Sequence, residues 1–233
     1  MPPTTDDKRL KALAAFLKKH HQCIDTAKLR ELKFPRDYAL RQVAAGRWQK
    51  VHRGVYCAYT GPLSFLSRCA AALLACGPKA ALAGPTAAQL QKLKGFDDQA
   101  VHVVIPHGTY APKLKGVRVR QSVALSERSI RARQGLRTLR PEWTTVGVAR
   151  LWPARARAVL AASVQQGLVL PEHLVACVLA IGRFPRCAAL LTTLGDIAGG
   201  TRSELEDIFP HIVRSFGLAL PATDLSANER GGG

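Results

Sequence analysis

Apolar residues near the N-terminus recur at the spacing of helices. The first predicted helix has its apolar stripe at Leu10, Leu13, Ala14 and Leu17, with basic residues on the opposite side. Asp25 is expected to cap a second short helix, because its carboxylate can accept a hydrogen bond from a backbone N–H of the first turn. Proline favours the first turn of a helix. Pro35 therefore predicts a third helix over about residues 36–45, and Gly46 ends it.

The next segment changes to the pattern of strands. Strand-forming residues lie on either side of a polar turn: Trp48 and Val51 before it, Val55 and Tyr56 after it. His52, Arg53 and Gly54 form the expected turn of a β-hairpin. Three short helices followed by a basic hairpin is the order of a winged helix-turn-helix, which is a DNA-binding module. The pattern therefore predicts such a domain over residues 1–60.

The rest of the chain favours a mixed α/β region. Residues 101–106 and 117–122 alternate as strands do, and the second of these strands has one basic face. Helices are expected over residues 64–78, 154–166, 171–181 and 185–198. The predicted fold class is α/β (α+β): an N-terminal winged helix-turn-helix, then an α/β domain with a small sheet and a helical C-terminal part over residues 61–200.

The charge of the chain points to a polyanionic partner. Its 233 residues include 34 Lys and Arg against 16 Asp and Glu, a net charge of +18. Residues 1–60 carry +8 and residues 110–160 carry +10. Double-stranded DNA is the expected partner. A membrane is the weaker candidate, because no apolar stretch has the length of a spanning helix and the N-terminus does not resemble a signal peptide. The expected compartment is the cytoplasm.

Composition and motifs give no candidate for catalysis. The six cysteines contain no C-x-x-C pair, and the histidines are not clustered at the spacing of metal ligands. Neither a G-x-x-x-x-G-K-S/T phosphate loop nor a G-x-G-x-x-G motif is present. We therefore expect no catalytic residue, no bound metal and no cofactor.

The third predicted helix is expected to present one face to the major groove. With Leu40 at the centre of the buried face and Val43 and Ala44 beside it, Tyr38 and Gln42 point outward. Gln42 is suited to pairing with adenine, and Tyr38 to contacting a thymine methyl group or a phosphate. Phosphate contacts are expected from the helix end and the wing, at Arg36, Arg41, Arg47, Lys50, His52 and Arg53. The alternative is a solvated face of a small helical domain.

A second basic segment extends from Lys113 to Arg157. Its surface positions are expected at Lys113, Lys115, Arg118 and Arg120. Three interpretations stay open for it. It could extend the DNA footprint, neutralise an acidic protein partner, or form an ordinary solvated face.

The run Gly46–Tyr56, GRWQKVHRGVY, resembles the start of the wing in AbiEi-type antitoxins of type IV toxin–antitoxin (abortive infection) systems, where an xGRWxRVxRGVY-like run closes the winged helix. The similarity continues through the helix at residues 64–78, the segment 83–96 and the two predicted strands, and covers about residues 8–218. It implies a regulator that represses its own operon by binding promoter DNA. It also implies a C-terminal domain that counteracts a nucleotidyltransferase-like toxin.

The sequence departs from the family pattern in one place. A helix start near residue 144 usually contains an Asp where this chain has Trp152, so the contact of that Asp is in doubt here.

The last segment, residues 201–233, resembles the first helix of an endonuclease-like domain that some relatives carry, followed by a disordered tail. Glu204, Glu206 and Asp207 lie on this one helix, and the strands that bear the metal carboxylates do not follow. We therefore expect a truncated endonuclease-like domain without activity. The alternative functions are a restriction- or repair-type endonuclease relative that lacks its catalytic core, and a pure interaction module.

Overall fold

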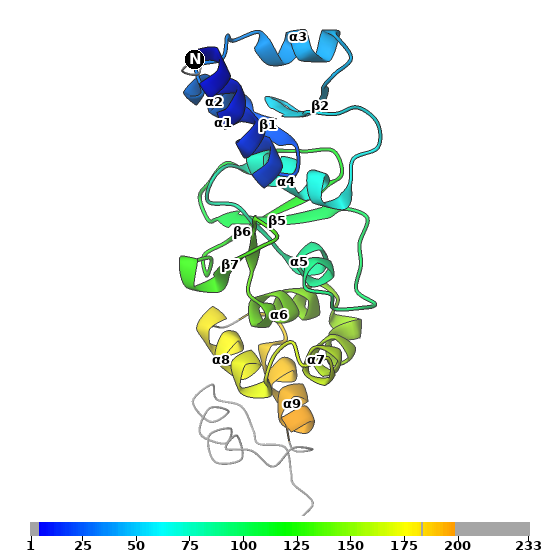
Figure 1. Cartoon of the computed structure of the whole chain (residues 1–233). Coiled ribbons are helices and arrows are strands. Elements are labelled where there is room, and N and C mark those ends of the chain that lie inside the picture. Colours follow the sequence, from blue (N-terminus) through cyan, green and yellow to red (C-terminus); the bar gives the residue numbers. More distant parts are fainter. Residues whose placement is uncertain (1–4, 183, 199–233) are drawn as a thin grey trace, which may run out of the picture.

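The computed structural model describes residues 5–182 and 184–198. The described elements follow one another along an elongated molecule, with α3 at one end and α9 toward the other (Figure 1). Glu204, Glu206 and Asp207, and with them the expected endonuclease remnant at residues 201–233, lie outside the described residues. In the described part, no helix is long and apolar enough to span a membrane.

The N-terminal part confirms the predicted winged helix-turn-helix. Its elements are α1 (Thr5–Lys19), β1 (Cys23–Asp25), α2 (Thr26–Glu31), α3 (Tyr38–Ala44), β2 (Gln49–His52) and β3 (Val55–Cys57). The strands form an antiparallel sheet in the order β1-β3-β2. The predicted hairpin is present, and Gly54 in its turn has a φ of +74°, which glycine adopts without strain. The sequence did not predict β1, which has only three residues.

The capping residue Asp25 and the apolar stripe of α1 determine how the first two helices pack. Asp25 caps α2 as predicted, because its Oδ1 accepts a hydrogen bond from the Lys28 backbone N–H at 2.8 Å. Leu13 and Leu17 of α1 are buried as expected. The prediction was wrong for Leu10, which is 50% exposed, and for Ala14. The buried side of α1 is rotated toward Phe16, which packs against the core with Leu13 and Leu17.

The small sheet is covered on both faces, because successive side chains of a strand point to opposite sides. Ile24 and Tyr56 pack with α1, α2 and α3. Cys23, Val55 and Cys57 pack on the other side, against α4 (Phe65–Cys76). Ser64 caps α4 as predicted, since its side chain accepts a hydrogen bond from the Ser67 N–H. The core of the winged helix therefore continues into the next part of the chain.

The middle of the molecule is built on a mixed sheet. In the described residues its strand order is β6-β5-β4-β8-β7, with β5–β6 and β4–β8 parallel and the other pairs antiparallel. The strands are β4 (Ala81–Leu82), β5 (Val101–Pro106), β6 (Val117–Ser122), β7 (Ile130–Arg133) and β8 (Leu136–Leu139), and a short 3-10 turn, η1 (Glu127–Ser129), precedes β7. The predicted strands 101–106 and 117–122 are confirmed, whereas β4, β7 and β8 were not predicted.

Helices cover both faces of this sheet. Leu82, Val103 and Leu136 pack toward α4, whereas Ala81, Val104 and Leu139 lie on the other face with Trp143 of α6. The elements on this side and beyond are α5 (Gly84–Leu90), α6 (Pro141–Leu151), η2 (Pro153–Arg155), α7 (Ala156–Gln165), α8 (Pro171–Ile181) and α9 (Cys187–Ala198). The predicted helix 171–181 is confirmed with the same bounds. The helices predicted from residues 154 and 185 begin two residues later.

The C-terminal helices enclose a second apolar core. Val146 of α6, Leu160 of α7, Leu174 of α8 and Leu191 of α9 are fully buried in one cluster. Trp152, which stands where the resembling family has an Asp, ends α6 and packs at the edge of this cluster. The domain boundaries proposed from the sequence, at residues 60 and 200, stay predictions.

The winged helix is also attached to the mixed sheet by polar contacts. His21 Nε2 donates to the carbonyl oxygen of Gln134, in the turn between β7 and β8, at 2.7 Å. The Ser67 hydroxyl on α4 donates to the carbonyl oxygen of His21 at 2.9 Å. Gly135 has a φ of +75°, and a Cβ there would lie 3.1 Å from the Lys19 carbonyl oxygen. The end of α1 is thus held against this turn.

Candidate nucleic-acid interface

An aromatic cluster fixes the position of α3. The ring of Tyr38 lies 4.5 Å from that of Phe34 and 5.7 Å from that of Trp48, measured between centroids. Phe34 and Trp48 are buried, so the helix begins on a rigid support. Helix α3 lies across the outer end of the molecule, so the side of this helix that points away from the core is exposed to solvent (Figure 1).

The predicted orientation of α3 was wrong. Leu40, expected at the centre of the buried face, is 57% exposed, whereas Ala39 is 2% exposed and packs in the core. Val43 lies one turn after Ala39 and packs with it. With these two residues inward, the 100° rotation per residue places Arg41 at the centre of the outward face, with Leu40 and Ala44 on one flank.

Tyr38 and Gln42, the predicted base-reading residues, lie on the other flank of α3. Both are half-buried. Gln42 Oε1 accepts a hydrogen bond from Arg47 Nε at 2.7 Å, so its amide is held toward the start of the wing. The orientation of α3 about its axis differs from the predicted one because Tyr38 packs into the aromatic cluster. This contact turns Tyr38 and Gln42 away from the centre of the outward face. Base contacts by these two residues stay predictions.

The wing carries basic side chains beside α3. Lys50 on β2 and Arg53 in the turn are exposed. His52 is half-buried, and burial lowers its pKa below the ordinary value of 6.5. It is therefore mainly uncharged at neutral pH and suited to a hydrogen bond more than to an ionic contact with phosphate.

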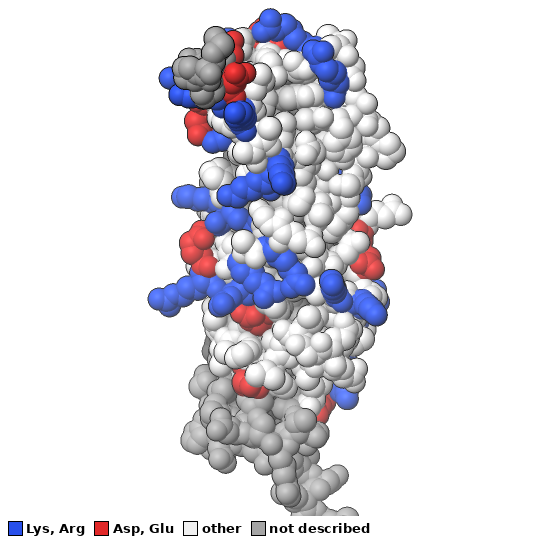
Figure 2. Space-filling view, in the orientation of Figure 1, with Lys and Arg blue, Asp and Glu red and all other residues white. Residues whose placement is uncertain are grey.

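The predicted phosphate-contacting residues lie at one end of the molecule. Arg36, Arg41, Arg47, Lys50 and Arg53 are all exposed. Arg41 Nε lies 3.3 Å from Asp37 Oδ2, while no carboxylate among the described residues lies within ion-pair distance of Arg36, Lys50 or Arg53. Figure 2 shows basic side chains over the end where Figure 1 places α3. This geometry suits a surface that follows a phosphate backbone.

Residues 11–59 match the family model described as "Transcriptional regulator, AbiEi antitoxin". The N-terminal part is therefore similar to the regulator domain of AbiEi antitoxins. The matched range begins within α1 and ends just after β3, so it covers α3 and the wing. A transcriptional regulator domain of this type is a DNA-binding domain, which agrees with the basic surface at this end of the molecule.

The fold is similar to that of a solved structure. The crystal structure of the RV2827C protein from Mycobacterium tuberculosis is similar with a TM-score of 0.52, and the match covers 92% of this chain and 83% of that chain. The two sequences are 16% identical, so the likeness concerns the fold alone. Among curated protein sequences, none matches this chain significantly.

The second basic surface predicted from the sequence lies along β6, which follows the winged helix in the chain. Arg118 and Arg120 alternate on this edge strand and are exposed, which confirms the basic face of the strand. Lys113 and Lys115 are exposed in the preceding loop. Figure 2 shows a group of basic side chains at mid-length, over the region of β6, β7 and α6. Arg150 of α6 lies within the predicted basic segment but was not among the predicted surface positions, and it lines a cavity together with Arg118 and Arg120.

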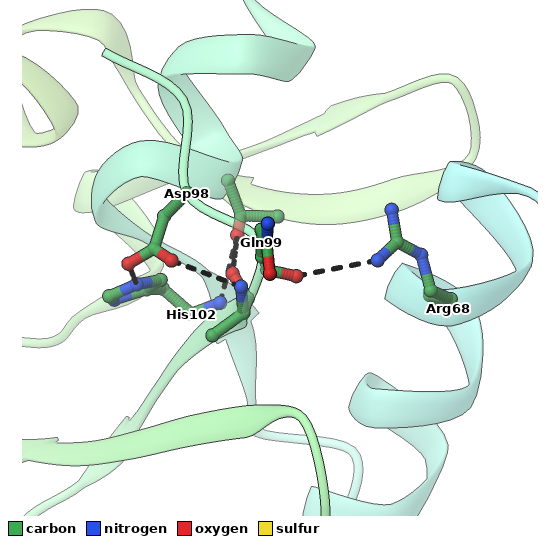
Figure 3. Close-up of polar contacts among 6 residues, drawn as sticks. Arg68, Asp98, Gln99 and His102 are labelled. Atoms are coloured by element: carbon green, nitrogen blue, oxygen red, sulfur yellow. Dashed lines mark hydrogen bonds and ion pairs between the residues drawn. The ribbon is translucent and has the colours of Figure 1, made fainter.

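A partly buried cluster of polar groups joins the loop before β5 to β5 itself and to α4 (Figure 3). His102 Nε2 lies 2.9 Å from Asp98 Oδ2, and the Ala100 N–H donates to Asp98 Oδ1 at 3.1 Å. Arg68 of α4 donates to the carbonyl oxygen of Gln99 at 3.3 Å. The hydrogen bond from His102 lowers the pKa of Asp98, whereas burial lowers the pKa of His102. Neutral His102 therefore donates to ionised Asp98.

Metal-binding clusters are not found in the part of the chain that the structure describes: no three His, Cys, Asp or Glu side chains converge there. The six cysteines, all within the described residues, are free thiols. Neither observation identifies a catalytic group among the described residues.

Acid is expected to destabilise the protein through its buried histidines. Because the pKa of His102 is lower in the folded state, the unfolded chain binds a proton at higher pH. The free energy of unfolding is therefore unaffected by protonation of this histidine above pH 6.5, the ordinary pKa of its side chain. It decreases as the pH falls below that value. His20 and His52 contribute in the same direction. We expect the thermal midpoint to fall between about pH 7.5 and pH 5.0, and His102→Gln to make that fall smaller.

The matched control is His107→Gln, because His107 is exposed in the loop after β5. This variant should keep the pH dependence of the unmodified protein. Differential scanning calorimetry across the pH range measures both variants. An unchanged dependence in His102→Gln would contradict the role given to this side chain.

Proposed function

We propose that this protein is a DNA-binding transcriptional regulator that binds double-stranded promoter DNA with α3 and the wing of its AbiEi-type domain. The supporting observation is the exposed basic surface formed by Arg36, Arg41, Lys50 and Arg53 on a domain that matches transcriptional regulators. Such a surface neutralises backbone phosphates and gives affinity that does not depend on sequence.

Sequence preference would come from the outward face of α3. In the proposed complex, Arg41 at the centre of this face enters the major groove, where an arginine can pair with the O6 and N7 atoms of guanine. Leu40 and Ala44 on its flank offer apolar contact to thymine methyl groups. Tyr38 and Gln42 on the other flank contact the edge of the groove. Arg36, Arg47, Lys50, His52 and Arg53 contact phosphates on either side.

The second basic surface gives the proposal a further element. Lys113 and Lys115 are exposed on the loop before β6 and are suited to contact with DNA beyond the main footprint. Arg118 and Arg120 also face solvent on β6, but both line a cavity. Their positive charges are therefore available to a ligand that is smaller than a DNA duplex.

The resemblance to AbiEi-type antitoxins extends the proposal to autorepression and to a toxin partner. In this view the bound promoter is that of the protein's own operon, and the part of the chain after the wing opposes a nucleotidyltransferase-like toxin. Support for the regulator role comes from the domain match over residues 11–59. Support for the toxin partner comes from the wider sequence resemblance.

Fluorescence anisotropy with labelled duplexes tests the proposal. The upstream promoter duplex and a shuffled duplex of equal length and composition are titrated across about 50 to 200 mM salt. We expect the promoter duplex to bind about a thousandfold or more tightly, and the affinity for both duplexes to fall with salt. Equal affinity for both duplexes at every salt concentration would contradict sequence-specific regulation. Absence of binding at the lowest salt would contradict a DNA-binding role.

A further inference from the structure

A solvent-open cavity of about 340 Å³ lies on the side of the mixed sheet opposite α4. Its walls come from distant parts of the chain: β5 and β6, α6, Ile181 at the end of α8, and Pro185. A volume of this size falls at the lower end of the range for small-ligand sites, about 300–1,000 Å³. The cavity is separate from α3 and the wing, none of whose residues line it.

Basic side chains line this cavity. Arg118 and Arg120 of β6 lie in register with His102 and Val104 of β5, so the four side chains share one face of the sheet. Arg150 reaches the same cavity from the last turn of α6. No carboxylate among the described residues lies within ion-pair distance of these arginines. Asp98, whose pKa Arg118 helps to lower, already accepts hydrogen bonds from His102 and the Ala100 N–H.

Arg150 is held in place by an aromatic ring. Its guanidinium carbon lies 4.3 Å from the centroid of the Phe184 ring, a distance at which a cation is attracted to the face of an aromatic ring. Burial lowers the pKa of Arg150, and the positive charge of Arg120 lowers it further. The positive charges of Arg120 and Arg150 therefore act on each other, no carboxylate among the described residues lies within ion-pair distance of either, and an anion bound between them would relieve their repulsion.

The remaining walls suit an organic group attached to that anion. Trp143, Leu139, Leu151 and Ile181 supply apolar surface, while Ser122, on the same face of β6 as Arg118 and Arg120, adds a hydroxyl group that can form hydrogen bonds. His102 lines the cavity in its neutral form, because burial lowers its pKa. Apolar walls with a few convergent polar groups are typical of sites for small organic ligands.

We propose that this cavity binds a small phosphorylated molecule of about mononucleotide size, with the phosphate held by Arg118, Arg120 and Arg150. Guanidinium groups match a phosphate because their forked N–H donors pair with several of its oxygens at once. The organic part lies against Trp143 and the neighbouring aliphatic side chains. A DNA duplex is too wide to enter a cavity of this volume, so the site does not depend on the proposed promoter binding.

Isothermal titration calorimetry with the full chain tests the site. Inorganic phosphate and adenosine monophosphate are titrated separately, and a short duplex DNA serves as the third ligand. We expect saturable binding of adenosine monophosphate at one site per chain, and weaker binding of phosphate alone. Arg150→Gln and Arg120→Gln should each weaken the nucleotide by about tenfold or more, since each removes charge-assisted hydrogen bonds.

Arg128→Gln is the matched control. Arg128 is exposed on η1 in the same region and does not line the cavity, so its removal lowers the net charge equally. The control should bind the nucleotide within about twofold of the unmodified protein, because a distant exposed charge is screened by salt. Absence of nucleotide binding at millimolar concentration would overturn the proposal. Equal weakening by Arg128→Gln, or arginine-dependent binding of duplex DNA without binding of nucleotide, would also overturn it.

Discussion

Replacing Lys50 and Arg53 together with alanine is expected to weaken the binding of promoter DNA by roughly ten- to hundredfold at low salt, because two phosphate contacts are lost. Both side chains are exposed, and no carboxylate among the described residues pairs with either of them. Their removal should therefore leave the fold intact. The slope of log affinity against log salt should become shallower by about two, one for each contact.

The loss should be nearly the same for promoter and shuffled duplexes, because phosphate contacts carry little sequence information. Lys79→Ala combined with Lys94→Ala is the matched control. It removes the same charge from exposed positions before β4 and after α5. An equal loss in this control would show that net charge, and not the wing, determines affinity. Unchanged affinity of the Lys50 and Arg53 double variant would contradict the proposed docking of the wing.

Ile24→Ala is expected to lower the free energy of unfolding by about 2–5 kcal/mol, the usual range for removing most of a fully buried aliphatic side chain. Ile24 has 0% exposure and lies on β1 between the sheet and the helices of the winged helix. Cys23 of β1 and Val55 and Cys57 of the adjacent strand β3 pack against α4 on the opposite face of the sheet. Loosening the first face should therefore destabilise both parts of the molecule together.

Urea unfolding followed by far-ultraviolet circular dichroism and by tryptophan fluorescence measures this effect. Trp48 reports on the winged helix, and Trp143 and Trp152 report on the region beyond it. We expect coincident transitions, both shifted in Ile24→Ala. Leu40→Ala is the control, because Leu40 is exposed on α3, and its effect should stay within about 0.5 kcal/mol. Two separate transitions, with only the first shifted, would contradict a shared core.

Regular alternation made some elements predictable from the sequence. The strands at residues 101–106 and 117–122 and the helix at 171–181 have the predicted bounds, because strong patterns end at turn residues or begin at a proline. The turn between β7 and β8 carried a weaker signal. Gln134 and Gly135 both have positive φ, as a two-residue hairpin turn needs, but the arginines flanking it obscured the strand pattern.

The orientation of α3 was not predictable from hydrophobicity. The helix has seven residues, and its buried position is Ala39, a small side chain that a hydrophobicity pattern ranks below Leu40. The aromatic contacts of Tyr38 with Phe34 and Trp48 decide the rotation, and these contacts exist only in the folded chain. The cavity was missed for a similar reason: Arg150 meets Arg118 and Arg120 only through the packing of α6 on the sheet.

The bond from His21 to the turn at Gln134, together with the two-sided packing of the small sheet, has a mechanical consequence. Over the described residues, the winged helix and the C-terminal helices are joined through packed elements along the length of the molecule (Figure 1). A flexible linker would let a cargo explore a wide volume around the operator. In the proposed DNA complex, a protein bound to α7, α8 or α9 would therefore be held at a nearly constant distance and direction from the double helix.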